Sequence, residues 1–171
     1  MSGIPGIRQA VMRNVLLLAV AVVFLMGCQS LMVTYQGATV HSEDRIPLVA
    51  GARQAGGYLT PDLAVDYQYS LNQSELDISG AVVFAGSISG NFSSIVNFHL
   101  SLVLLDAEGR IVGTKLLGAT SFSDPSDPIP FSERIALPPG VSGMAFLYGG
   151  DAREGGEEGV TTTFWHYPIT K

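Results

Sequence analysis

The sequence is poor in residues that cross-link chains, ligate metals or act as nucleophiles. It holds one cysteine, Cys28, and three histidines, His41, His99 and His166, in 171 residues. One cysteine cannot form an internal disulfide, and a zinc site needs about four converging ligands. Neither a His-Glu-x-x-His motif nor a G-x-S-x-G motif occurs. We therefore predict no catalytic residue, no enzyme activity and surface roles for the histidines.

Long hydrophobic runs are also missing, with one short exception near the amino terminus. Residues Val15 to Met26 contain no charged or polar side chain, but these 12 residues fall short of the ~20 that a helix needs to cross a bilayer. Arg8 and Arg13 precede the run, and no acidic residue does. A basic segment followed by a short apolar one is typical of a secretory signal peptide, which we predict as a helix within residues 1–27.

The signal ends in Leu25-Met26-Gly27-Cys28, with an aliphatic residue three positions before the cysteine and a small one directly before it. This tetrad resembles the lipobox of bacterial lipoproteins. The resemblance implies cleavage between Gly27 and Cys28, diacylglycerol on the Cys28 sulfur and an acyl chain on its new amino group. Gln29 stands where Asp would favour retention in the inner membrane. The resemblance therefore implies an outer-membrane lipoprotein facing the periplasm, with an inner or plasma membrane lipoprotein as the alternative.

A different reading of Cys28 treats it as a small buried hydrophobic residue, which requires the whole signal pattern to be accidental. Under the lipoprotein reading, the exported chain keeps no free thiol, so an oxidising compartment does not affect it. Several acyl chains on one residue would hold it stably, because a single chain gives only marginal membrane binding.

Positive charge is scarce in the mature chain. Removal of residues 1–27 takes away two of nine basic residues and none of 15 acidic ones, so the net charge of the mature chain is 7 − 15 = −8. An acidic chain is a poor partner for nucleic acid or for anionic lipid. The expected partners are membrane lipid, through Cys28, and another protein of the cell envelope.

Helical periodicity is absent after the signal, and alternation with a period of two replaces it. We predict a lipidated tether at residues 28–61, with one short extended piece at 46–50, and a β-sandwich domain at residues 62–171. The predicted strands lie at 63–71, 76–84, 96–104, 110–117, 131–137, 143–148 and 160–167.

Short strands separated by turns are typical of an antiparallel β-sandwich of immunoglobulin or fibronectin-like type, with a small β-barrel as the alternative. There is no Cys…Trp…Cys framework, so an antibody-type domain is excluded. The core must therefore come from aliphatic and aromatic side chains. We expect Phe98, Leu102, Phe146 and Trp165 among them.

The third strand and its hairpin read "LVLLDAEGRIVGT". They resemble the FxLYD-type domains of bacterial envelope proteins, with Leu in place of the Phe and Tyr of that pattern. The resemblance implies a β-sandwich with a surface or accessory role and no catalytic residues. The matching positions are Leu102, Leu104, Leu105, Asp106, Gly109 and Val112.

Two acidic segments are candidate ion sites. The loop 149–159 is rich in glycine and carries the weak calcium candidates Asp151, Glu154, Glu157 and Glu158. Their spacing matches no ordered calcium loop, so a solvated hairpin tip is the favoured interpretation. Asp124 and Asp127 precede prolines and are interpreted as Asx turns.

Taken together, these features predict a lipid-anchored, non-enzymatic envelope protein with a structural or accessory interaction domain. The exposed edges of its sheets would be the docking sites for a partner chain. The alternative is a lipoprotein that binds a small ligand or a metal.

Overall fold

The structure, a computed structural model, describes residues 35–156 and 159–170. The predicted signal peptide, Cys28, Gln29, Glu157 and Glu158 lie outside these residues. Tyr35–Lys171 forms one compact unit. No helix among the described residues is long and apolar enough to cross a membrane.

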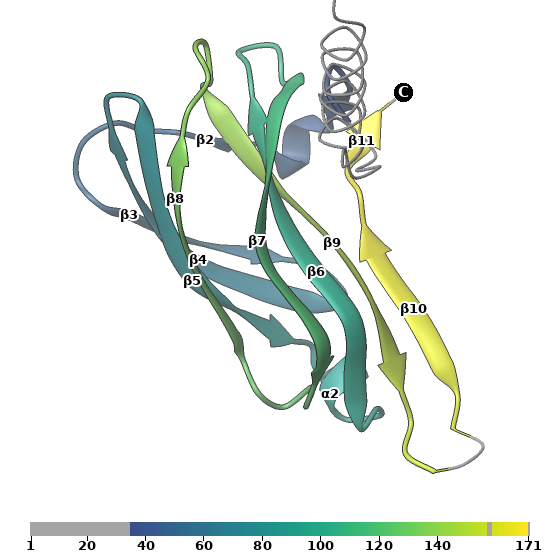
Figure 1. Cartoon of the computed structure of the whole chain (residues 1–171). Coiled ribbons are helices and arrows are strands. Elements are labelled where there is room, and N and C mark those ends of the chain that lie inside the picture. The colour runs from purple at the N-terminus through teal and green to yellow at the C-terminus, as the bar shows by residue number, and fades with distance from the viewer. Residues whose placement is uncertain (1–34, 157–158, 171) are drawn as a thin grey trace, which may run out of the picture. The chain divides into compact units, whose positions relative to one another are not determined.

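Two large antiparallel sheets and a two-stranded sheet, β1-β11, make up the described domain (Figure 1). One has the order β10-β9-β6-β7, with β2 paired to the start of β9, and the other has the order β3-β4-β5-β8. The main strands are β3 (Gln54–Leu59), β4 (Leu63–Asn72), β5 (Glu75–Phe84), β6 (Ser94–Leu105), β7 (Ile111–Ser123), β8 (Ile129–Ala136), β9 (Gly143–Arg153) and β10 (Thr161–His166). The short elements are β1 (Thr39–Val40), η1 (Ser42–Asp44), β2 (Ile46–Pro47), α2 (Gly86–Ser89) and β11 (Ile169–Thr170).

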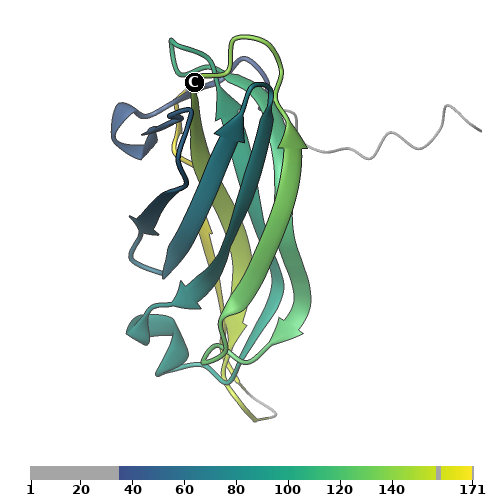
Figure 2. The ribbon, with the colours of Figure 1, turned by 90° about the vertical axis from the view of Figure 1, so that its left-hand side faces the viewer.

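The sheets lie face to face and do not close into a barrel, so the predicted all-β sandwich is confirmed (Figure 2). The strands predicted from 63 onward correspond to β4 through β10. Alternation specifies them because successive side chains of a strand point to opposite faces. In β4, for example, Leu63, Val65 and Tyr69 are buried while Asp66 is exposed.

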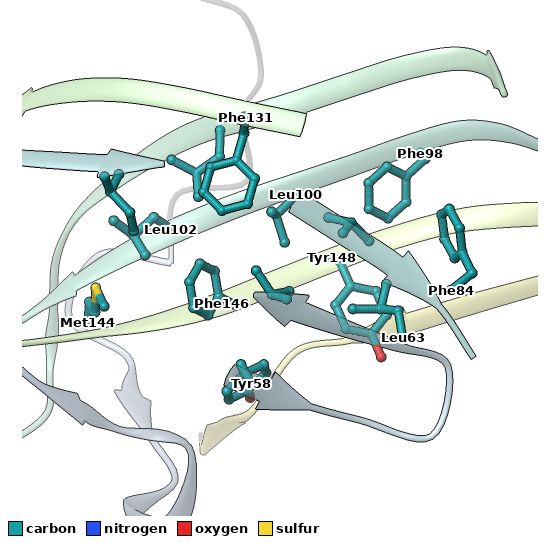
Figure 3. Packing of buried hydrophobic residues seen from close by; sticks show 14 of the residues in the cluster. Tyr58, Leu63, Phe84, Phe98, Leu100, Leu102, Phe131, Met144, Phe146 and Tyr148 are labelled. Carbon is teal, nitrogen blue, oxygen red and sulfur yellow. The ribbon is translucent and has the colours of Figure 1, made fainter. Parts of the chain in front are cut away.

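The main hydrophobic cluster fills the space between the sheets (Figure 3). Phe98, Leu102 and Phe146 are buried there, as predicted. Trp165 is a wrong prediction, because its side chain is 63% exposed. Its neighbour Phe164 takes the inward position of β10, and adjacent strand residues cannot share a face.

A second hydrophobic cluster lies on the outer face of the five-stranded sheet. Val103, Leu105, Ala145 and Leu147 alternate with the inward residues of β6 and β9, so they point away from the main cluster. The two ends of the described chain cover them, and there β1 pairs with β11. The covering residues are Tyr35, Ala38, Val40, Tyr167 and Ile169.

The predicted tether is therefore wrong for residues 35–61, which belong to the compact unit. β3 lies within this range and completes the four-stranded sheet beside β4. Its Gly56 and Gly57 carry no side chain and hide the alternation that marks other strands. The extended piece predicted at 46–50 corresponds in part to β2.

Candidate functional site

A polar cluster lies where β3 and β10, the last strands of the two sheets on one side, approach each other. It consists of Asp44, Tyr58 and His166 and is called the Tyr58 cluster below. Tyr58 is the inward residue of β3 next to Gly57, and His166 is the last residue of β10. Asp44 ends the short helix η1. Residues 122 positions apart thus meet at one point.

The single proton of the Tyr58 hydroxyl determines the direction of the hydrogen bonds in this cluster. The Tyr58 hydroxyl lies 2.5 Å from Asp44 Oδ1 and 2.6 Å from His166 Nε2, and His166 Nε2 lies 3.3 Å from Asp44 Oδ1. Tyr58 has a single proton, and the carboxylate is the stronger acceptor, so Tyr58 donates to Asp44. His166 then donates its Nε2 proton to the Tyr58 oxygen. The Tyr58 hydroxyl, Asp44 Oδ1 and His166 Nε2 thus contact one another.

A second tyrosine adds to the polar contacts between the two sheets. Tyr148, on β9, stacks on His166 with a ring-centroid separation of 5.6 Å. Its hydroxyl reaches the turn between β3 and β4, where it lies 2.7 Å from Thr60 Oγ1 and donates to Asp62 Oδ2 at 3.0 Å. Its ring is fully buried. The hydroxyl therefore joins the core to the rim of the sandwich.

Both tyrosines are held in the neutral form. Burial raises the pKa of Tyr58 far above its usual value, and the hydrogen bond to Asp44 and the charge of that carboxylate raise it further. Burial also raises the pKa of Tyr148, with a contribution from the bond to Asp62. Neither side chain can act as a base near neutral pH, because a phenolate would lose these bonds. The two tyrosines thus link β3 and the β3–β4 turn of one sheet to β10 and β9 of the other.

The acidic loop is shorter than predicted. Residues 149–153 continue β9, and a bond from Glu154 N to Val160 O at 3.0 Å closes the loop. Asp151 thus lies within a strand, where it accepts from Thr163 Oγ1 at 2.7 Å and Asn97 Nδ2 at 3.3 Å. These bonds lower its pKa. Within residues 35–156 and 159–170, no group of three or more His, Cys, Asp or Glu residues could hold a metal ion.

The predicted Asx turn at Asp124 is confirmed. Asp124 Oδ1 accepts from Ser126 N at 2.8 Å, and its carbonyl accepts from Asp127 N at 3.2 Å. These bonds hold the connection between β7 and β8. Asp124 is therefore engaged in turn formation.

Sequence reasoning missed a hollow on the outer face of the four-stranded sheet. It measures about 600 Å³, and its floor comes from small polar residues of β4, β5 and β8. Arg134 Nε donates to Asp77 Oδ1 at 2.7 Å and lies 3.4 Å from Glu75 Oε1, so its charge is already paired. Arg53 adds a second guanidinium at the rim. The signal that could have revealed this pairing is opposite charge on neighbouring strands.

The fold places the chain in the class of antiparallel β-sandwiches, with a covering ribbon on one outer face made from residues 35–40 and 167–170. No protein-family model, curated protein or solved structure matches the chain. Its role must therefore be argued from its own residues.

Proposed function

We propose that this chain is a lipid-anchored protein of the cell envelope whose sandwich is a non-enzymatic interaction module. The observation that carries this proposal is the order of three features in the sequence: a basic segment, a 12-residue apolar run and Leu25-Met26-Gly27-Cys28. Diacylglycerol on the Cys28 sulfur and an acyl chain on its amino group would form the anchor. Gln29 at the next position favours the outer membrane, facing the periplasm.

The position of the compact unit supports an anchored role. The unit begins at Tyr35, only seven residues after Cys28. Seven residues span at most about 25 Å when fully extended. An anchor at Cys28 would therefore keep the sandwich beside the membrane, without a long spacer.

The edge of β3 supports an interaction role. It ends the four-stranded sheet and carries neither proline nor a charged residue, which are the usual devices that block edge pairing. At the other end of that sheet, β8 carries both Pro130 and Arg134. An extended segment of a partner could add to β3 through main-chain hydrogen bonds. The Tyr58 cluster, whose side chains bond to one another across the two sheets, is consistent with a structural role.

Attachment is tested by mass spectrometry and membrane fractionation of the chain expressed with its full signal. We expect a mature amino terminus at Cys28 with the added mass of three acyl chains, recovered with membranes. Cys28→Ala should abolish both the added acyl mass and the recovery of the protein with membranes. Gln29→Asp, as a matched variant, should keep the acyl mass and move the protein to the inner membrane. Unchanged processing of Cys28→Ala would contradict the proposal.

Docking is tested by placing a photo-activated crosslinking residue at Ala55 on β3 or at Ser132 on β8, both exposed on the same outer face. We expect a discrete adduct with one envelope protein from Ala55 and none from Ser132. Equal labelling from both positions would refute recognition through the β3 edge.

A small-ligand role has one observation in its favour, which is the hollow beside Arg53 and Arg134. Such a role predicts that inorganic phosphate or calcium raises the midpoint of thermal unfolding. A flat response to both would leave the interaction role as the better supported function.

A further inference from the structure

The outer face of the five-stranded sheet is only half covered. The chain ends shield the second hydrophobic cluster, which occupies the part of β6 and β9 around Val103 and Ala145. Farther along the same strands, toward the β9–β10 loop, Tyr167 reaches as far as His99, and Phe122 and Trp165 are exposed. The residues there can be placed by strand register.

Two rows of side chains cross this uncovered part. Trp165 pairs with Gly149, which pairs with His99, which pairs with Ala119. The next row runs from Thr163 through Asp151 and Val96 to Phe122. A bulge between Val96 and His99 keeps Ile95 and Phe98 in the main core and turns Val96 outward.

The exposed apolar residues of these rows, with Leu116 opposite Ser101, form what we call the open face: Leu116, Ala119, Phe122 and Trp165. Trp165 is 63% exposed and Phe122 is 67% exposed. Exposed apolar side chains on one face can contribute to a surface that another surface covers.

Charge separates this face from the one on the opposite sheet. Along the two rows and the pair beyond them, the charged side chains are Asp151 and Arg153, which have opposite signs. Asp151 is also bonded to Thr163 and Asn97. The outer face of the four-stranded sheet instead carries the paired charges around Arg134. Among the described residues of these rows, the open face thus carries one charge of each sign and two exposed aromatic side chains.

The anchor side of the chain meets the domain on this same face. Tyr35 packs against the second cluster, and its ring centroid lies 5.7 Å from that of Tyr167. The Tyr167 hydroxyl lies 2.9 Å from His99 Nε2, in the row of Trp165. The seven residues from Cys28 to Tyr35 span at most about 25 Å, so an anchor at Cys28 would stay within that distance of Tyr35. The outer face of the other sheet lies beyond a second layer, about 10 Å farther away.

We propose that the open face rests on the lipid surface that holds Cys28, with Trp165 and Phe122 at the level of the headgroups. This inference rests on the lipid anchoring proposed above. Tryptophan suits such a place because its ring is apolar while its N–H can stay hydrated. The near-neutral charge of the face avoids the repulsion that an acidic surface would meet at a bilayer. The β3 edge, on the other sheet, would stay free for a partner.

Trp165 is the only tryptophan of the chain, so its fluorescence reports on this face alone. The test uses the processed, acylated protein in phosphatidylcholine vesicles, with or without bromine on the lipid acyl chains. We expect emission at shorter wavelength than for the Cys28→Ser protein without lipid, and loss of intensity in brominated vesicles. Leu116→Ser with Phe122→Ser should reverse much of both effects.

A matched double variant, Leu59→Ser with Val83→Ser, removes exposed apolar residues from the opposite outer face and should change neither effect. Both variants should keep the unfolding midpoint of the parent. If acylated protein floats with the vesicles but Trp165 stays water-exposed and unquenched, the docking inference is overturned while the anchor stands. If no acylated protein floats, the anchor proposal itself fails. Shielding of Trp165 that appears only with dimerisation, in the absence of lipid, would assign the face to a second copy and overturn the inference.

Discussion

Replacing Val40 by alanine tests whether the segment before β3 is part of the fold or a tether. The Val40 side chain is fully buried in the second hydrophobic cluster. Its main chain is held as well, because Val40 N donates to Gly109 O at 3.0 Å and Val40 O accepts from Arg45 Nη2 at 2.7 Å. A tether residue would have none of these contacts.

The magnitude follows from what alanine removes. Val40→Ala deletes two methyl groups, each worth about 0.8 kcal/mol of burial, and leaves a small cavity that adds to the loss. We therefore expect the free energy of unfolding to fall by about 2 kcal/mol. With a urea dependence of about 2 kcal/mol per molar, the midpoint should move down by about 1 M.

The assay is urea unfolding of the mature chain carrying Cys28→Ser, followed by circular dichroism. Val49→Ala is the matched control, since Val49 lies in the same segment but is 52% exposed. Its backbone N–H, which donates to Tyr69 Oη, is unchanged by the substitution. The control should move the free energy by less than about 0.5 kcal/mol. Equal effects of the two substitutions would refute the inclusion of this segment in the folded domain.

Three other outcomes can be measured in the same assay. Tyr58→Phe should cost about 1–2 kcal/mol, because it removes the donor to Asp44 and leaves that carboxylate short of a partner. Burial raises the pKa of Tyr58 above 10, so the contribution of Tyr58 to stability is complete below pH 10 and is lost as pH rises further. Tyr58→Phe should therefore flatten the decline in stability at alkaline pH. An unchanged decline would count against this assignment. Gly80→Ala should destabilise the fold by about 3 kcal/mol, because the new Cβ would overlap a backbone oxygen of β4 and the ring of an inward phenylalanine. In Gly86→Ala the new Cβ meets no atom, so this control should be nearly neutral. Similar unfolding midpoints for the two glycine variants would refute the predicted overlap.

The sequence predicted those strands in which inward side chains alternate without interruption. In β6, Phe98, Leu100 and Leu102 are separated by more polar residues, and the alternation alone identifies the buried face. β3 escaped detection because only Tyr58 marks its inward side among glycines. The phase of β10 was ambiguous for a related reason. Phe164 and Trp165 are adjacent and both apolar, so the pattern could not indicate which one faces inward.

The candidate site could not be predicted because no local spacing encodes it. Asp44 and Tyr58 are 14 residues apart, and His166 follows 108 residues after Tyr58. Only the pairing order of the strands brings β3 and β10 to the same side of the sandwich. The proposed lipid attachment presents the opposite case. Its sequence signal lies within a few consecutive residues and does not depend on the fold.

The covering ribbon joins the segment after the proposed lipidation site to the folded domain. The segment that would connect the anchor to the domain becomes part of the domain at Tyr35, where it shields the second cluster together with the last residues of the chain. A pull on the chain at Tyr35 would therefore act on β1 and its pairing with β11. If Cys28 is lipidated as proposed, a connection of seven residues would keep the membrane within about 25 Å of Tyr35, on the side of the covering ribbon. The β3 edge, on the other sheet, would then be the surface available to a partner.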